Sequence, residues 1–377
     1  MVRRAFRYRC YPSPQQAQEL VRTFGCVRKV DNVAHAQRTR ALFQEQRRVS
    51  YADTSALLTG WKKDPDLAYL RQVSCVRSQQ GLRHLQTAYA GFWAGTCPSP
   101  QFTAERKSGA CAEYSRSGVR FKGGQLTLAK MSDPVDIVWS RPLPDGAESS
   151  TVTASVDSAG RWHVSILVQD TVTAVAADGR SVGLDAGVST LLTLATGQEV
   201  PNLRHERADR VRLAKAQRQH ARTQKGSRNR RKARLTVGKV YARIAARRRD
   251  DLFKVTTGLV RENQTVVIED LAVRSMVGNH PLARAISDAP WRDLRGMLEY
   301  TTDWYGRELV VVDGWFPSST VCSACGHVAA SIPASVREWV CTTCGAAHDR
   351  DVNAAQNVRS EGLSVIACGG AMRPTRR

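Results

Sequence analysis

The sequence has no apolar run approaching the roughly 20 residues that a membrane-spanning helix requires. Its first residues, MVRRAFRYRCYPSP, also lack the apolar stretch of about 7–15 residues that marks a signal peptide. These two absences exclude a membrane partner and a secreted product from the expectations. We therefore expect a soluble, intracellular protein.

Acidic residues are scarce relative to basic ones. The chain of 377 residues has 34 Asp and Glu against 56 Lys and Arg, which leaves a net charge of +22 and an isoelectric point near 10.1. A charge of this size opposes compaction by self-repulsion, so a polyanionic partner is the simplest explanation. Hydrophobic residues make up 42%, enough for the cores of two or three domains and too many for a disordered or collagen-like chain.

Regular spacing is rare among the ten cysteines. Six of them are scattered and are expected to be small core side chains or free thiols in a reducing compartment: Cys10, Cys26, Cys75, Cys97, Cys111 and Cys368. The other four form two CxxC pairs that are separated by 15 residues: Cys322 with Cys325, and Cys341 with Cys344.

The spacing of these two pairs is typical of a four-thiolate zinc site. A glycine follows each pair, at Gly326 and Gly345, and allows the tight turn that surrounds such a ligand pair. Four thiolates complete a tetrahedron, so the sequence predicts one structural Zn²⁺. The alternative, a redox CxxC pair, would need a thioredoxin-like context that is absent from the pattern. His348 lies nearby in the sequence and is left outside the predicted ligand set.

Hydrophobic periodicity divides the chain into blocks. The start alternates apolar with basic residues up to Pro12, as a strand does, and residues from Pro14 to about Gly95 have helical spacing. Residues from Gln101 to about Asp170 predict short strands, including a hairpin around Gly160. One interpretation is a small barrel with helices inserted after its first strand. An α+β unit follows, with buried strands and a last helix at DVNAAQNVRS.

The stretch between Arg204 and Arg249 contains 18 Lys and Arg against Glu206 and Asp209, a net charge of +16. Its apolar residues recur with helical spacing except at KGSRNRRK, which predicts a helical hairpin with a basic bend. A solvated helix face is the ordinary explanation of such a run, but this density favours contact with phosphates. The candidate phosphate-binding residues are those of the densest cluster: Lys225, Arg228, Arg230, Arg231 and Lys232.

Three carboxylates occupy positions that otherwise predict buried elements. Asp185 lies in a strand, Glu269 ends the apolar run TVVIE, and Asp351 begins the last helix. Buried carboxylates are costly unless they are paired or bind a metal, and three of them at one sheet edge would suit Mg²⁺ or Mn²⁺. Two such ions about 3.5–4 Å apart support phosphodiester hydrolysis. Taken singly, each acid has an ordinary alternative, such as a helix cap or a turn.

The motifs GLDAG, VVIEDL and HDRDVNAAQN resemble the three RuvC-type, RNase-H-like nuclease motifs of the TnpB family. YRCYPSPQQ, TFGCVRKVDN, KGSRNRRK and FPSSTVCSACG are also similar to that family, so that the resemblance covers nearly all of residues 1–370. TnpB proteins are RNA-guided DNA endonucleases of prokaryotic insertion sequences. The resemblance implies that Asp185, Glu269 and the second aspartate of HDRD, Asp351, form the metal-binding catalytic triad.

The resemblance also implies an α+β multidomain architecture. Its parts would be a wedge-like β-barrel at residues 1–13 and 101–175, an inserted helical recognition block at 14–100, a RuvC-like nuclease domain at 176–320 and 347–362 with the basic hairpin 204–249, an inserted zinc ribbon at 321–346, and a flexible tail at 363–377.

The partners implied by the resemblance are a guide RNA from the end of the element and a double-stranded DNA target. One chain would act with one RNA in the cytoplasm, near the nucleoid, and would read a short motif beside the target. Similarity around VSCVRSQQGLRHL implies that Arg77, Gln79 and Gln80 read this DNA motif. An equal alternative is that the three are ordinary polar residues of a helix.

Two other functions fit much of the same pattern. A catalytically silent, RNA-guided DNA-binding repressor would have the same fold, and the presence of all three acids argues against it. A DDE-type transposase would also use three acids, and the cysteine module directly before the last acid favours the nuclease. A miniature CRISPR effector is a variant of the first interpretation that only the neighbouring genes separate.

Overall fold

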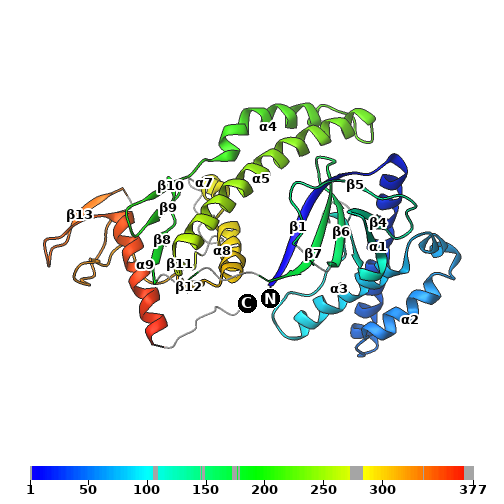
Figure 1. Cartoon of the computed structure of the whole chain (residues 1–377), viewed down its shortest axis with the longest axis horizontal. Coiled ribbons are helices and arrows are strands. Elements are labelled where there is room, and N and C mark those ends of the chain that lie inside the picture. Colours follow the sequence, from blue (N-terminus) through cyan, green and yellow to red (C-terminus); the bar gives the residue numbers. More distant parts are fainter. Residues whose placement is uncertain are drawn as a thin grey trace. The chain divides into compact units, whose positions relative to one another are not determined.

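The computed structural model describes residues 2–104, 109–144, 146, 149–171, 176, 179–271, 283–333 and 335–368. The chain separates into two compact units, the first ending at Thr171 and the second beginning at the next residue. In Figure 1 the first unit is coloured blue to green and the second green to red. None of the helices in the described ranges is long and apolar enough to cross a membrane.

The first unit is built on an antiparallel sheet. Its longest strand, β1 (Val2–Tyr11), buries Phe6, Tyr8 and Cys10 on one face because side chains alternate between the two faces of a strand. The sheet order is β2-β6-β7-β1-β5. The other strands and the short 3₁₀ helix of this unit are β2 (Ala110–Ser115), η2 (Arg116–Gly118), β3 (Val119–Lys122), β4 (Gln125–Leu128), β5 (Asp136–Val138), β6 (Ser149–Val156) and β7 (Trp162–Asp170).

Two predictions for this sheet have different outcomes. The predicted hairpin around Gly160 is confirmed. β6 pairs with β7 from Ser149 opposite Val168 to Val156 opposite Trp162, and Gly160 has the positive φ of 74° that the turn requires. β1 pairs with both β7 and β5, so the first strand joins the later ones. Closure of this sheet into a barrel stays a prediction, because the described order runs from β2 at one end to β5 at the other.

The helices of the first unit follow β1 directly. Ser13 and Ser50 each begin a helix with a capping box, in which the serine hydroxyl accepts the backbone N–H three residues later. Leu20 and Phe24 of the first helix join the core of the sheet. Val30 of the same helix packs with the other helices in a second core around Leu82. The helices are α1 (Pro14–Gln44), α2 (Tyr51–Trp61), the 3₁₀ helix η1 (Pro65–Gln72) and α3 (Cys75–Trp93).

The second unit contains a mixed sheet with the order β10-β9-β8-β11-β12. The three strands β8, β11 and β12 are parallel, and β9 and β10 are antiparallel to their neighbours. The residues between the two ends of each parallel strand are all apolar, as expected where both faces of a sheet are covered. The strands are β8 (Ser181–Asp185), β9 (Thr190–Leu194), β10 (Glu199–Pro201), β11 (Thr265–Glu269) and β12 (Glu308–Val312).

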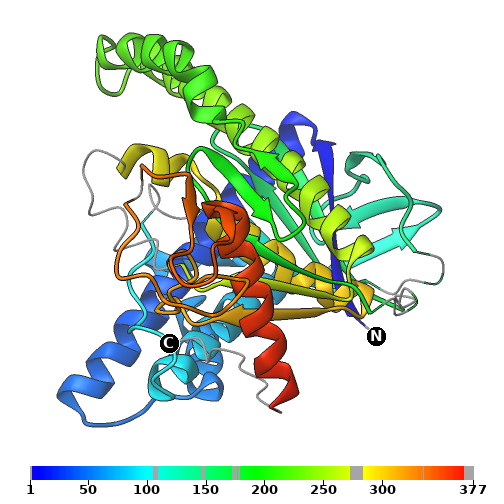
Figure 2. The ribbon, with the colours of Figure 1, turned by 90° about the vertical axis from the view of Figure 1, so that its left-hand side faces the viewer.

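Helices cover both faces of this sheet (Figures 1 and 2). On β11, Val266 and Ile268 join the core beneath α5 (Arg228–Glu262) and α8 (Trp291–Tyr305), whereas Val267 packs on the opposite face with Val358 of α9 (Arg350–Ala367). The contact with α9 is close: a Cβ at Gly183 of β8 would lie 2.1 Å from the carbonyl oxygen of Ala355. The absence of a side chain at Gly183 therefore lets α9 lie directly on β8.

Three further segments complete the unit. The stretch 204–249, predicted as a helical hairpin, contains α4 (His205–Ala221) and the first part of α5, which continues to Glu262; α7 (Ala283–Asp288) precedes α8. The cysteine module contains a short antiparallel pair, β13 (Glu338–Val340) and β14 (Ala347–Asp349). Its hairpin therefore extends to Asp349, beyond the predicted limit of 346. The predicted tail boundary at 363 is wrong because α9 continues to Ala367, and residues 369–377 lie outside the described ranges.

Candidate active site and metal centre

Two of the three predicted acids lie side by side. Asp185 is the last residue of β8 and Glu269 is the last residue of β11. The two strands are parallel neighbours whose register pairs Leu184 with Ile268, so the next residues along each strand are also adjacent. Both carboxylates thus lie at the carboxyl edge of the sheet, where ligand sites of α/β folds gather.

The third acid comes from the helix that covers this sheet. Asp351 is in the first turn of α9, and its negative charge acts on Asp185. Asp349 has a different role: its side chain caps α9 by accepting the backbone N–H of Val352 at 2.9 Å, and it is exposed. Of the two aspartates of HDRD, Asp351 is therefore the one whose charge acts on Asp185, whereas Asp349 serves as the helix cap.

The surroundings of Asp185 and Glu269 raise the pKa of both carboxyl groups. Burial, reinforced by the negative charges of Glu269 and Asp351, raises the pKa of Asp185 to about 7. Burial also raises the pKa of Glu269, and a hydrogen bond from Ser318 lowers it in part. A buried carboxylate whose pKa is raised by neighbouring acids is typical of functional sites, and oxygen ligands suit Mg²⁺. The three do not form a closed cage, because within the described ranges only the cysteine module brings three or more candidate ligand atoms within 4.8 Å of one another.

Sequence reasoning missed two residues that contact these acids. Ser318 donates a hydrogen bond from its hydroxyl to Oε1 of Glu269 across 49 residues of chain. Arg337 lies 2.8 Å from Oδ2 of Asp351. Neither residue belongs to a strand or helix of the sheet, and their only signal in the sequence was proximity to the cysteine motif. Glu269 and Asp351 are therefore each held by a side chain from the segment between β12 and β14.

The four predicted zinc ligands converge. Their Sγ atoms all lie within 4.8 Å of one another, with 3.7 Å between Cys322 and Cys344 and 3.7 Å between Cys325 and Cys341. Each pair closes the same turn: the N–H of the following glycine donates to the carbonyl of the first cysteine, at 2.8 Å for Gly326 and 2.9 Å for Gly345. Both glycines have positive φ. A tetrahedral set of thiolates is the arrangement that fits a structural Zn²⁺.

The cysteine module is attached to α9 by buried amides. Asn353 donates to the carbonyl of Val321 at 2.7 Å and accepts the N–H of Ser323 at 2.9 Å. Asn357, one turn later, donates to the carbonyls of Ser318 and Val321. These bonds explain the two asparagines at a spacing of four in the motif NAAQN. Within the module, Nε2 of His348 lies 3.1 Å from Sγ of Cys322 and is placed to donate a hydrogen bond to a thiolate.

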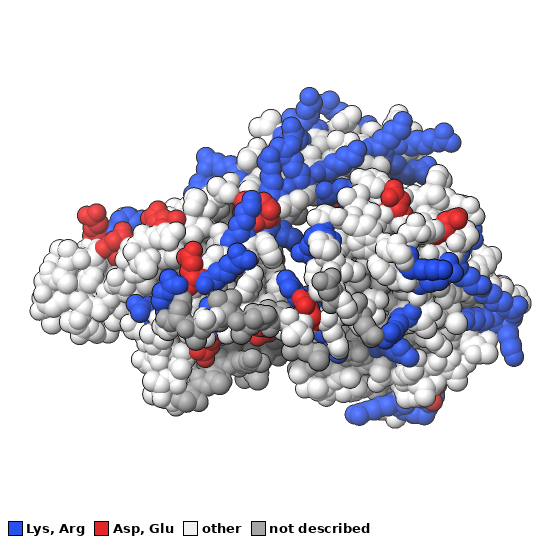
Figure 3. All heavy atoms as spheres, in the orientation of Figure 1, with Lys and Arg blue, Asp and Glu red and all other residues white. Residues whose placement is uncertain are grey.

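The basic bend between α4 and α5 exposes most of its predicted cations. Lys225, Arg228, Arg231 and Lys232 are exposed, and Figure 3 shows Lys and Arg crowded over this hairpin. Arg230 differs, because its Nη1 donates to the carbonyls of Thr223 and His220, at 2.7 and 3.2 Å, and so caps the end of α4. Four of the five residues thus present charge to solvent, while the fifth also holds the bend.

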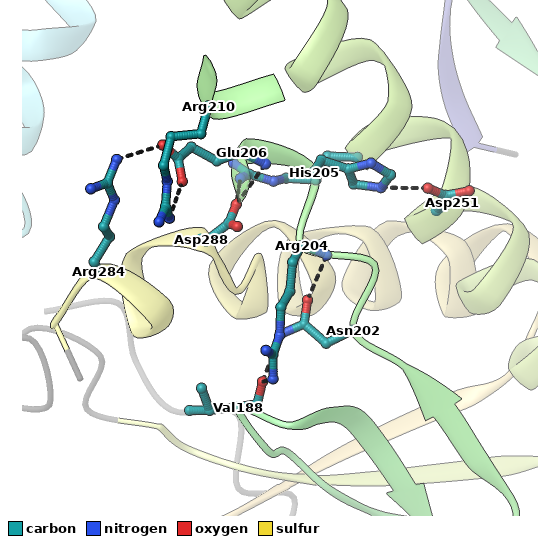
Figure 4. Close-up of polar contacts among 10 residues, drawn as sticks. Val188, Asn202, Arg204, His205, Glu206, Arg210, Asp251, Arg284 and Asp288 are labelled. Carbon is teal, nitrogen blue, oxygen red and sulfur yellow. Dashed lines mark hydrogen bonds and ion pairs between the residues drawn. The ribbon is translucent and has the colours of Figure 1, made fainter. Parts of the chain in front are cut away.

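The base of the hairpin is fixed by contacts between basic and acidic side chains (Figure 4). His205 at the start of α4 lies 2.6 Å from Asp251 of α5, and Arg248 lies 2.7 Å from Asp288. Glu206 accepts from Arg210 and Arg284 at 2.8 Å each. These contacts set the direction in which the basic helices leave the sheet.

The prediction that Arg77 reads a base edge is wrong. Arg77 is only 1% exposed, its guanidinium lies 3.5 Å from the ring centroid of Tyr114, and it donates to the carbonyl of Ala129 at 3.0 Å. It therefore joins α3 to the sheet of the first unit. Gln80 donates to Glu113 at 2.8 Å, and Gln79 is half-buried. A role of these two amides in DNA recognition stays a prediction.

Models of known protein families match the chain in three places. Residues 1–47 match a family described as "Helix-turn-helix domain", residues 163–280 match OrfB_IS605, described as "Probable transposase", and residues 291–358 match "Cas12f1-like, TNB domain".

Whole-length relatives have closely similar names. A Streptomyces pristinaespiralis protein named "Putative RNA-guided DNA endonuclease" is 59% identical over 375 residues, which cover 100% of this chain and 93% of that protein. An Escherichia coli K12 protein named "Putative RNA-guided DNA endonuclease InsQ" is 29% identical, covering 97% and 94%. A chain of the solved Cas12f1-sgRNA-target DNA complex aligns with a TM-score of 0.58 at 14% identity, over 92% of this chain and 83% of that chain, and supports the fold alone.

The fold and the acids place the chain among proteins with a mixed α/β sheet that carries carboxylates at its edge. The whole-length identity is decisive for the family: the chain belongs to the TnpB family. The resemblance inferred from the motifs is therefore confirmed.

Proposed function

We propose that this protein is an RNA-guided DNA endonuclease that hydrolyses phosphodiester bonds at the site formed by Asp185, Glu269 and Asp351. The observation that carries the proposal is the adjacent placement of Asp185 and Glu269 at the carboxyl edge of two parallel strands, with Asp351 close enough to raise the pKa of Asp185. The names of the whole-length relatives support the same activity.

The three carboxylates would hold two Mg²⁺ ions, or Mn²⁺ in their place. When bound, these ions would activate the attacking water and stabilise the leaving oxygen. The protein's own groups prepare the site: Ser318 orients Glu269 through its hydroxyl, and Arg337 holds Asp351. The four-cysteine module would bind one structural Zn²⁺ that takes no part in the chemistry.

The exposed cations of the α4–α5 bend would contact the guide RNA. Phosphate contacts of this kind give affinity without sequence information, so the sequence would be read by base pairing between the guide and the DNA. The solved Cas12f1 neighbour contains both an sgRNA and a target DNA. A short motif beside the target would be read by the protein, and Arg77 would take no part in this reading because it is buried.

A cleavage assay with the purified protein and its co-purified RNA tests the proposal. The RNA is sequenced, and a DNA duplex that matches its guide segment is supplied with Mg²⁺ or with EDTA. We expect cutting only with RNA, a matched duplex and Mg²⁺ together, and no cutting but intact binding by Asp185→Ala. Binding without cutting by the parental complex would support the silent repressor. Joined DNA products would support the DDE-type transposase.

A further inference from the structure

Trp315 is the most exposed large hydrophobic side chain in the described part of the chain, with 93% of its surface accessible to solvent. Single exposed apolar residues are common on proteins and need no function. Trp315 is unusual because of its position: it lies between β12 and the cysteine module, three residues before Ser318, whose hydroxyl bonds to Glu269.

The loop that displays Trp315 is held against the active-site edge of the sheet. The N–H of Trp315 donates to Oδ1 of Asp313 at 2.9 Å, which fixes its backbone in a tight turn. At Gly314 a Cβ would lie 2.4 Å from the carbonyl oxygen of Asp270, the residue that follows Glu269. The backbone beside Trp315 therefore lies directly against the strand end that carries a catalytic carboxylate.

The residues after Trp315 prevent the loop from turning its indole inward. Phe316 packs against the apolar cluster beneath α9, which contains Val267 and Val358. The carbonyl of Ser318 accepts a hydrogen bond from Asn357 at 2.8 Å. Gly314 on one side of Trp315 and Phe316 and Ser318 on the other are all held in the fold. The fixed backbone therefore directs the side chain of Trp315 to solvent. A large aromatic ring on a fixed backbone is a preorganised surface for contact.

We propose that Trp315 is a stacking platform for an unpaired base of the DNA strand that enters the Asp185–Glu269–Asp351 site. This inference rests on the proposed function. Glu269 of this site ends β11, against which the loop of Trp315 packs through Gly314, so a strand at the carboxylates would run close to this loop. An unpaired base is the group of that strand that presents a flat apolar face. Stacking on an indole accepts any base, as an enzyme whose sequence is read by a guide requires.

The role predicted for Trp315 is positioning. Stacking of one base would hold the adjacent phosphate in register with the carboxylates, so its loss should slow cutting and leave binding of the target unchanged. The typical energy of base–aromatic stacking corresponds to a loss of about 10- to 100-fold in rate. Because the side chain is exposed, its replacement should not disturb folding.

The test uses the RNA complex with a matched duplex and compares Trp315→Ala, Trp315→Leu and Trp315→Phe. We expect single-turnover cutting to fall about 10- to 100-fold in Ala and Leu and to stay within about 3-fold of the parent in Phe, which keeps an aromatic face. Phe43→Ala is the matched control, since Phe43 of α1 is 73% exposed and lies in the first unit, away from the acids in sequence. Target affinity and Tm should match the parent in every variant.

A direct readout uses 2-aminopurine, a fluorescent base, placed at successive positions of each DNA strand near the cut. In the Asp185→Ala complex we expect one position to be quenched, and Trp315→Leu to remove that quenching. Parental cutting by Trp315→Ala or Trp315→Leu, or the absence of Trp315-dependent quenching, would overturn the stacking role while the proposed function stands. If the parental complex does not cut, the proposed function fails, and the quenching measurement still decides whether a base stacks on Trp315.

Discussion

Arg337 donates from Nη1 to both carboxylate oxygens of Asp351, at 3.1 Å to Oδ1 and 2.8 Å to Oδ2. Its backbone is equally fixed, because the N–H of Arg350 donates to the Arg337 carbonyl at 2.7 Å where β13 and β14 begin to pair. Arg337 lies four residues before Cys341 and Asp351 lies three residues after His348. The position of Asp351 therefore depends on the fold of the cysteine module, to which Arg337 belongs.

Loss of the zinc should accordingly damage the active site as well as the module. We expect Cys341→Ser to lose most of the one Zn²⁺ per chain, to lower the Tm by several degrees and to reduce cutting, because metal binding and folding are linked in such modules. Elemental analysis, thermal unfolding and cleavage measure these effects. Cys368→Ser is the control, since Cys368 is exposed and outside the cluster. A full equivalent of zinc and parental Tm in Cys341→Ser would contradict the assignment.

The register of the third motif can be tested with two aspartates. We expect Asp351→Asn and Glu269→Gln to abolish cutting, because each removes a negative oxygen from the site, and to leave target binding intact. Asp349→Asn should cut at nearly the parental rate, since asparagine caps a helix about as well as aspartate. Cleavage and binding assays on the same RNA complexes provide the measurement. Normal cutting by Asp351→Asn with inactive Asp349→Asn would shift the motif by two residues.

The raised pKa of Asp185 predicts a pH dependence of stability. The folded protein raises this pKa from 3.8 to about 7, so it binds the proton more tightly than the unfolded chain does. The stabilising contribution is complete below about pH 4 and is lost as the pH rises to about 7. In EDTA, Asp185→Asn should therefore gain stability relative to the parent over this range, on the order of 2–4 kcal/mol.

Thermal unfolding from pH 4 to pH 8 measures this difference. The Tm of Asp185→Asn minus that of the parent should increase with pH in EDTA, and Mg²⁺ should stabilise the parent only. Cutting by the parent should rise through about pH 7, because protons compete with the metal for Asp185. A difference in Tm that is independent of pH would show that Asp185 does not carry the raised pKa.

The basic bend offers a pair of matched variants. Charge reversal at Arg231 and Lys232 should weaken RNA binding broadly and lower its dependence on salt, because both side chains are exposed and would contact phosphates by charge alone. The Tm should not change. Arg230→Glu should also lower the Tm, since Arg230 holds the carbonyls at the end of α4. RNA affinity across a salt series and thermal unfolding separate the two effects, and equal RNA affinity in the double variant and the parent would exclude the bend as an RNA contact.

Much of the second unit could be predicted because its signals are local. An apolar run of five residues is sufficient to indicate a buried strand, and alternation or helical spacing is visible within a few turns. The convergence of the thiols within each CxxC pair could be predicted, since each glycine-containing turn brings two thiols together within five residues. Asp185 and Glu269 could be paired in advance because residues at the ends of buried parallel strands meet at one edge of the sheet.

Roles that depend on a distant partner could not be read in this way. A lone arginine in a helix looks the same in the sequence whether it faces solvent or, as Arg77 does, lies beneath a tyrosine from a strand more than thirty residues later. The roles of Arg230 and Arg337 likewise depend on the partners that packing brings to them, which are backbone carbonyls for Arg230 and a carboxylate for Arg337. Local spacing thus determined the elements, the thiol set and the candidate acids, whereas packing between remote segments decided which cations are free, because burial and hydrogen-bond partners are properties of the folded chain.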